Sequence, residues 1–286
     1  MKSDHFSVTF AYNWGVASLE SYIADRVARG RAYFSKEEAL ESVGQSSRAF
    51  VSAAQRLVRK RVLASPKRGF YIAIRPEDAP TGAPDPVRWI DPLMHYLGLD
   101  YRVSLLRAAA FHGSSHQAAM LFQLVAPKQL PEVTVGRHKI QFVYQAPSSF
   151  SRVNQADWLD QMKSEAGFAK VAGIELTLLD AARYFHKAGG INGAAQIVHD
   201  LGAKAVPRKL AQAAAAYENS AVRRLGYLLD HFGHERQAGV LVTFAKNAKS
   251  VKPLDPSVKA LVEASELREK DLKWMLTINE AVEIDS

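Results

Sequence analysis

Four polar side chains between residues 48 and 59 have the types and spacing needed to contact the edges of DNA bases. Arg48, Ser52, Gln55 and Arg59 follow one another at i, i+4, i+7 and i+11, which places them on one side of a helix. Arginine can bond guanine and glutamine can bond adenine through two hydrogen bonds, and serine can bond to either. We call these four residues the polar face, and the pattern predicts that this helix enters the major groove.

The net charge of the chain lies around the same helix. Between Ser42 and Pro76 there are eight Lys and Arg and no Asp or Glu. Removing these eight from the 37 Lys and Arg of the chain leaves 29, which equals the number of Asp and Glu. The excess of +8 is therefore confined to one segment, and we call residues 43–75 the basic segment. Such a local excess is typical of a nucleic-acid-binding surface.

The elements before the polar face predict a helix-turn-helix. Leu19 begins a helical apolar pattern that Gly30 ends, and Ser35 begins a capping box for a second helix that ends at Gly44. Ser46 or Ser47 would cap the third helix. Its apolar side consists of Phe50, Val51, Ala54, Leu57 and Val58.

Two strands are predicted to follow, at 62–65 and 70–74, joined by a basic turn at 66–69. A hairpin with Lys67 and Arg68 at its tip would be the wing of a winged helix and would lie against phosphates or in the minor groove. The predicted phosphate contacts are Ser46, Ser47, Arg56, Lys60, Arg61, Lys67 and Arg68. Basic helices are often only solvated, and winged helices also dock RNA or protein, but the agreement of these features favours duplex DNA.

Composition predicts a cytoplasmic protein with more than one domain. The chain has 286 residues, no Cys and no apolar run near the ~20 residues of a membrane-spanning helix. Four prolines between 76 and 86 predict a semi-rigid spacer. We therefore expect a winged helix-turn-helix domain at 1–75, a linker at 76–86 and a larger domain at 87–286.

The second domain is predicted to be α+β. A helix is expected at 101–111 and strands at 120–125 and 139–144, with helices thereafter. The expected helices are 155–166, 175–188, 191–201, 207–231, 234–248 and 256–279.

No catalytic, metal or cofactor site emerges from the sequence of this domain. His112 and His116 have the i, i+4 spacing of a metal pair, but Gly and Ser lie between them, and a structural turn is the better interpretation. His231 and His234 flank Gly233 at a helix end, where they can cap carbonyl groups. Glu175 and Asp180 suggest a helix start rather than a catalytic carboxylate pair.

Four segments together resemble the AbiEi-type antitoxins, which are transcriptional regulators of type IV toxin–antitoxin systems. They are the hairpin at 67–71, the run 101–109 leading to Gly113 and Gln117, the run 175–180, and the run 223–229. Their order and spacing cover about 17–232 of the chain. One departure is Leu176, where many relatives have Arg, so no role of that Arg can be transferred.

This resemblance implies a protein with two activities. The winged helix would bind inverted repeats in the promoter of its own operon and repress it. The C-terminal domain would neutralise an AbiEii-like nucleotidyltransferase toxin without forming a stable complex, in a system of phage defence. The chain would be a monomer in solution or a dimer on DNA, without a membrane partner.

Two other classes of function stay open at this level. One is a stand-alone transcription factor whose C-terminal domain senses a ligand, and the gene next door would distinguish it from an antitoxin. The other is an enzyme acting through the region of His112 and His116, which bound metal in the purified protein would support.

Overall fold

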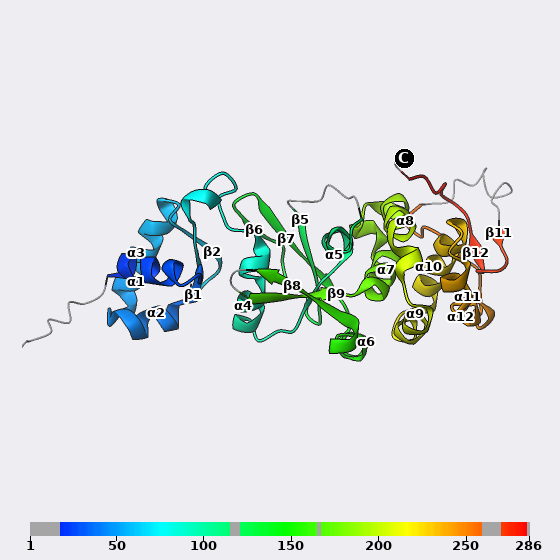
Figure 1. The fold of residues 1–286 in the computed structure, drawn as a ribbon, viewed down its shortest axis with the longest axis horizontal. Coiled ribbons are helices and arrows are strands. Elements are labelled where there is room, and N and C mark those ends of the chain that lie inside the picture. The colour runs from blue at the N-terminus through cyan, green and yellow to red at the C-terminus, as the bar shows by residue number, and fades with distance from the viewer. Residues whose placement is uncertain (1–17, 115–120, 165–166, 259–269, 285–286) are drawn as a thin grey trace, which may run out of the picture. The chain divides into compact units, whose positions relative to one another are not determined.

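The computed structural model describes residues 18–114, 121–164, 167–258 and 270–284. The chain divides into two compact units after Pro84, and each is described by itself. Among the described residues, no helix is both long and apolar enough to cross a lipid bilayer. Figure 1 shows the elements of each unit.

The first unit consists of three helices and a small antiparallel sheet. In chain order its elements are α1 Leu19–Ala28, β1 Tyr33–Ser35, α2 Lys36–Val43, α3 Ser47–Arg59, β2 Leu63–Lys67 and β3 Phe70–Ala73. The sheet has the order β1-β3-β2, so β3 is central. The sequence did not predict β1, which has only three residues and is a strand because it pairs with β3, with Phe34 opposite Tyr71.

Local sequence signals explain the helix ends of this unit. The Ser35 hydroxyl accepts a hydrogen bond from the Glu38 amide, and the Glu38 carboxylate accepts one from the Ser35 amide, which is the predicted capping box. Gly44 follows α2 with φ of 66°, a left-handed conformation that glycine adopts without a Cβ clash. Phe34, Phe50 and Leu57 belong to the core on which the three helices pack.

The hairpin is tighter than predicted. The strand β2 continues through Pro66 to Lys67, so the connection to β3 is only Arg68 and Gly69. A register shift between Ala64 and Lys67 accommodates the proline. The Ser65 hydroxyl donates to the carbonyl oxygens of Lys67 and Phe70 at 3.0 Å each and so holds the two strands together.

Two short 3₁₀ helices begin within residues 76–86, for which the sequence predicts a spacer. These are η1 Pro76–Asp78 and η2 Pro86–Arg88. Each begins with proline, whose missing amide costs nothing at the first position of a helix. Ala83 and Pro84 are buried, so the end of the first unit is folded.

The second unit begins with a mixed sheet. Before the sheet is complete the chain forms α4 Ile90–Tyr96, β4 Arg102–Val103, α5 Leu105–Phe111, β5 Leu121–Ala126, β6 Val133–Val135, β7 His138–Tyr144, α6 Pro147–Val153, η3 Ala156–Trp158, β8 Leu159–Ser164 and β9 Gly167–Ala172. The six strands are ordered β6-β7-β5-β4-β9-β8, with β5 parallel to β7 and β4 parallel to β9.

Helices fill the rest of this unit. They are α7 Ile174–Arg183, η4 Phe185–Lys187, α8 Gly190–Leu201, η5 Gly202–Lys204, α9 Pro207–Ala214, α10 Asn219–His231, α11 Glu235–Gly239 and α12 Val242–Lys246. The helix α7 packs against α5, α8, α9 and α10 (Figure 1). Short strands β10 Lys252–Pro253, β11 Lys270–Asp271 and β12 Leu276–Thr277 form a second small sheet.

The mixed α+β class is as predicted, but several elements of the second unit are not. Residues 155–166 were expected to be a helix, and the described part contains η3 and the strand β8 instead. The expected helix 101–111 is a strand followed by a helix, and 207–231 is two helices separated at 215–218. The end of the expected helix 256–279 carries β11 and β12, while 259–269 lies outside the described residues.

The C-terminal segment is fastened to α10 by buried groups. The Arg223 guanidinium donates to the carbonyl oxygens of Ser250 and Met275, and that of Arg224 donates to those of Leu254 and Ala182. Burial lowers the pKa of Arg224 to about 10, so the group is still charged at neutral pH.

A glycine on α10 makes room for the aromatic side chain of this segment. Trp274 is fully buried, and its indole N–H donates to Asp230 at 2.6 Å. A Cβ placed on Gly226 would lie 2.1 Å from the Trp274 ring. No Cβ can be that close to carbon, so any other residue at 226 must displace the indole.

We therefore predict that Gly226→Ala lowers the free energy of unfolding by about 1–3 kcal/mol through overpacking. The matched control is Gly239→Ala, because a Cβ on Gly239 meets nothing within 4 Å. That variant should be unchanged or stabilised by up to about 1 kcal/mol. Urea unfolding of both variants checks this, and equal stability of the two would contradict the packing of Trp274 on Gly226.

Candidate nucleic-acid interface and buried polar centre

The helix α3 is held in place by its cap and by one apolar side. The Ser46 hydroxyl accepts the Ala49 amide at 3.2 Å, so Ser46 is the cap and Ser47 is the first helical residue. Phe50, Ala54 and Leu57 are buried in the core of the first unit. Val51 is half-buried, and Val58 is 36% exposed rather than packed as expected.

All four residues of the polar face are exposed on the other side of α3. None of their side chains makes a hydrogen bond or an ion pair with a residue that the structure describes. The two sides of the helix therefore separate as the 3.6-residue period requires. Long polar side chains that are exposed in this way are available to a ligand.

The basic segment contains both available and engaged cations. Lys60, Arg61 and Lys67 are exposed and form no ion pair within the described part of the chain. Arg56 lies 3.2 Å from Glu20, but both side chains are more than half exposed, and such surface pairs contribute about 0–1 kcal/mol. Arg75 is different, because its side chain is only 13% exposed and pairs with Glu77.

Some of the predicted phosphate-binding cations lie in the hairpin and in the connection between α3 and β2. Lys67 and Arg68 are exposed at the tip of the hairpin. Arg61 has φ of 56°, a left-handed conformation uncommon for a residue with a Cβ, where the chain leaves α3. All of the predicted DNA-contacting residues lie between 46 and 68 in the first unit, and each is exposed.

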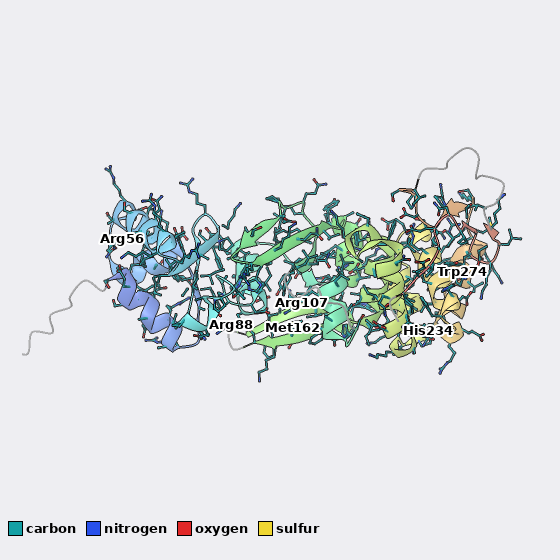
Figure 2. The ribbon with its side chains drawn as sticks, turned by 90° about the horizontal axis from the view of Figure 1, so that it is seen from above. Arg56, Arg88, Arg107, Met162, His234 and Trp274 are labelled. Atoms are coloured by element: carbon teal, nitrogen blue, oxygen red, sulfur yellow. The ribbon has the colours of Figure 1, made fainter. Side chains whose placement is uncertain are left out.

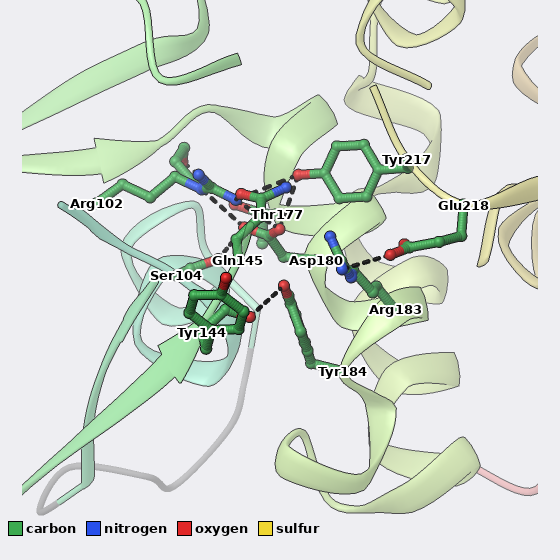
Figure 3. Close-up of polar contacts among 11 residues, drawn as sticks. Arg102, Ser104, Tyr144, Gln145, Thr177, Asp180, Arg183, Tyr184, Tyr217 and Glu218 are labelled. Atoms are coloured by element: carbon green, nitrogen blue, oxygen red, sulfur yellow. Dashed lines mark hydrogen bonds and ion pairs between the residues drawn. The ribbon is translucent and has the colours of Figure 1, made fainter. Parts of the chain in front are cut away.

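A buried ion pair lies at the centre of the second unit. Arg102 and Asp180 are both fully buried, on β4 and α7. The Arg102 Nε donates to Asp180 Oδ2 at 2.9 Å, and Nη2 donates to Oδ1 at 2.8 Å (Figure 3). Two parallel bonds of this kind are the strongest geometry available to these groups.

Neutral partners complete this pair, and we call the five residues Arg102, Ser104, Gln145, Asp180 and Tyr217 the buried polar centre. The hydroxyls of Ser104 and Tyr217 donate to the Asp180 carboxylate at 2.6 and 2.7 Å. Gln145 accepts from Arg102 Nη2 at 2.8 Å. The Asp180 carboxylate therefore accepts four hydrogen bonds.

The charges of the centre influence one another strongly. Burial opposes the charge of Arg102, but the Asp180 carboxylate more than compensates and raises the pKa of the guanidinium. Burial and the same carboxylate raise the pKa of Tyr217 well above its ordinary value. Arg102 is thus always charged and Tyr217 always a hydrogen-bond donor.

The sequence interpretation did not find this centre. It took Asp180 as part of a helix start and assigned no role to Arg102, Gln145 or Tyr217. The available signal was that two mainly apolar runs carry opposite charges, Arg102 and Arg107 in 101–109 and Glu175 and Asp180 in 174–182, because a charge in a buried element needs a partner.

Two of the histidines considered in the sequence, His112 and His231, pack against neighbouring groups of the second unit. His112 is 8% exposed, and its Nε2 lies 2.7 Å from the Ala172 carbonyl oxygen. His116 lies outside the described residues. His231 packs edge-on against Phe232, and the described residues contain no group of three or more side chains that could hold a metal ion.

We predict that Asp180→Ala lowers the free energy of unfolding by about 3–5 kcal/mol, because it leaves the charge of Arg102 buried without a partner. Replacing both charges, as Arg102→Met with Asp180→Leu, should recover much of the loss. The control is Lys139→Ala, which breaks an exposed pair with Glu132 and should cost less than about 1 kcal/mol. Urea unfolding measures all three, and an Asp180→Ala variant as stable as the control would disprove the role of the pair.

Comparison with known proteins bears on both units. The chain is similar in structure to the RV2827C protein from Mycobacterium tuberculosis, with a TM-score of 0.61 and 18% sequence identity over 90% of this chain and 89% of that one. At this identity the likeness establishes a shared fold. No curated protein matches the chain in sequence.

Residues 102–231 match the family model of the AbiEi antitoxin C-terminal domain. The match begins at Arg102 and contains all five residues of the buried polar centre. It also includes two of the runs on which the sequence resemblance depends, 175–180 and 223–229. This match identifies residues 102–231 as a domain of the AbiEi antitoxin C-terminal type and supports an AbiEi-type antitoxin of a toxin–antitoxin system.

Proposed function

We propose that the chain is the antitoxin of a type IV system and that its first unit is a winged helix-turn-helix that binds and represses its own promoter. The observation that carries DNA binding is the polar face of α3, which is exposed and without partners among the described residues. The order of helices and strands in the first unit, with a basic hairpin after the third helix, supports the winged-helix assignment.

The exposed residues of the first unit would contact two different parts of the DNA. Arg48, Ser52, Gln55 and Arg59 would contact base edges in the major groove. Arg56, Lys60, Arg61, Lys67 and Arg68 would bind phosphates, with the N-terminus of α3 at Ser46 and Ser47 adding backbone amides. Breaking the pair between Arg56 and Glu20 would cost little, because both groups are exposed.

The operator would be an inverted repeat in promoter DNA. A two-fold repeat requires two copies of α3, one for each half-site, supplied by a dimer on DNA or by two monomers that bind side by side. The chain would otherwise be a monomer in solution.

The second unit would neutralise an AbiEii-like nucleotidyltransferase toxin without a stable complex. The support is the family match at 102–231, which covers the buried polar centre and the helices around it. Because the fold of this domain depends on that centre, neutralisation should depend on it as well.

We predict that Arg48→Ala and Gln55→Ala each weaken promoter binding by about 1–3 kcal/mol and relax specificity at one base pair. Lys67→Ala should weaken binding to all sequences alike, because a phosphate contact carries no sequence information. Gel shifts with promoter and scrambled DNA separate the two results. Normal promoter binding by both Arg48→Ala and Gln55→Ala would disprove the assignment of the polar face.

The salt dependence tests the basic segment as a whole. If about six cations contact phosphates, the logarithm of the association constant for DNA should fall with the logarithm of the salt concentration at a slope near −5. A slope near zero would mean that phosphates are not bound by this segment. The exposed lysine Lys246, outside the segment, provides a control variant that should leave the slope unchanged.

Co-expression in bacteria with the nucleotidyltransferase that we propose as its partner separates the two activities. The double variant Arg48→Ala, Gln55→Ala, expressed from an unrelated promoter, should lose repression and still protect cells. Asp180→Ala should lose protection. Protection that is lost together with DNA binding would contradict separate roles for the two units.

A ligand-sensing transcription factor is the alternative. It is favoured by one observation, a hollow in the second unit that is large enough for a small molecule.

A further inference from the structure

Residues of η2, α5 and β8 surround a hollow of about 640 Å³ in the second unit. Its walls include Val87 and Arg88 of η2, Arg107 of α5, and Met162 and Lys163 of β8, and Figure 2 labels three of these residues. Asp85 completes the wall beside η2. The volume lies within the range of about 300–1,000 Å³ that is usual for small-molecule sites.

The lining carries three cations and one carboxylate. Asp85 accepts from Arg107 Nη2 at 3.1 Å and also accepts the Val87 amide at 2.9 Å, so the carboxylate is engaged in holding the wall. Lys163 is exposed and makes no ion pair with any described residue. The excess of positive charge in this hollow favours an anionic ligand.

The guanidinium of Arg107 is held in a defined position. It lies over the Phe122 ring, 5.3 Å from the ring centroid, and its side chain is 21% exposed. Its Nη2 is bonded to Asp85, whereas its Nη1 makes no hydrogen bond with any described residue. A planar group of this kind, with a donor still unused, is suited to bind a phosphate through two hydrogen bonds.

The start of α5 fixes the backbone from which Arg107 projects. Leu105 is fully buried with φ of 54°, a conformation that a residue with a Cβ rarely adopts. It persists because the neighbours on both sides are bonded: the Ser104 hydroxyl donates to Asp180, and the Leu106 amide donates to Gln123 Oε1 at 3.1 Å. The site is thus built on a rigid turn next to the buried polar centre.

We propose that this hollow binds the phosphate groups of a small phosphorylated molecule the size of a nucleotide. Arg107, Arg88 and Lys163 would contact the phosphates, and the apolar side chains of Val87 and Met162 would contact the sugar or base. All of these residues belong to the second unit, so the site is separate from the polar face of α3 and goes beyond the proposed function.

Titration calorimetry of the full-length protein tests the site with four probes: ATP, GTP, inorganic triphosphate and adenosine. The three phosphorylated probes should bind saturably, with one molecule per chain, and adenosine should not. Tighter binding of ATP or GTP than of triphosphate identifies a nucleotide as the ligand. Equal binding identifies the phosphate groups alone as the recognised part, and both results support the site.

Two variants on different elements locate the binding. Arg107→Gln should weaken ATP binding at least about tenfold, the effect of one charged hydrogen-bonded contact. Lys163→Gln should weaken it about threefold or more, and because Lys163 is exposed, this variant should fold even if Arg107→Gln does not. Thermal unfolding of each variant separates loss of binding from loss of fold.

Two control variants distinguish this site from general attraction of anions. Lys139→Gln on the exposed side of β7 and Arg48→Ala on α3 should both bind ATP as the unchanged protein does. No saturable binding of any phosphorylated probe would overturn the proposal. Loss of ATP binding in Arg48→Ala, or no loss in Lys163→Gln and a folded Arg107→Gln, would overturn it as well.

Discussion

The buried ion pair between Arg102 and Asp180 is the interaction on which the second unit depends. Two fully buried charges are tolerated only if each neutralises and hydrogen-bonds the other. The pair therefore fixes β4 against α7 with little freedom. Tyr217, between α9 and α10, donates to the same carboxylate and brings the helical part to the sheet. The centre therefore joins segments up to 115 residues apart in the chain, and the Arg102–Tyr217 bond spans that distance. Hydrophobic burial alone would hold these layers together, but it would not determine their register so closely.

The arginines of the polar face and those at Arg102 and Arg224 are used in opposite ways. In the first unit, α3 presents arginines outward, and those of the polar face have no partners among the described residues. In the second, Arg102 and Arg224 are turned inward, where each bonds a carboxylate or backbone carbonyls. The difference follows from the function each charge can serve, since an inward charge must be satisfied within the chain while an outward one is available to a ligand. In the sequence, the outward-facing cations are seen as an excess of positive charge that is confined to the basic segment.

The sequence predicts well where structure is determined locally. The capping box at Ser35 and the two sides of α3 were found because caps and helical period depend on residues a few positions apart. It fails where contacts between residues far apart in the chain determine the secondary structure. The strand β8 is an edge strand whose polar residues have little strand preference, and it is a strand because it pairs with β9. The predicted helix 207–231 is broken at 215–218, where Tyr217 turns toward Asp180, and no local signal marks that bond.

The same long-range constraint links the buried polar centre to the hollow beside it. Ser104 belongs to the centre, Leu105 follows in a strained conformation, and Arg107, two residues further on in the first turn of α5, lines the hollow. A group that binds Arg107 therefore acts on a backbone that Asp180 already restrains through Ser104. The conformation of Leu105 is thus explained by its position: it starts α5 where the first turn both adjoins the buried polar centre and supplies Arg107 to the hollow.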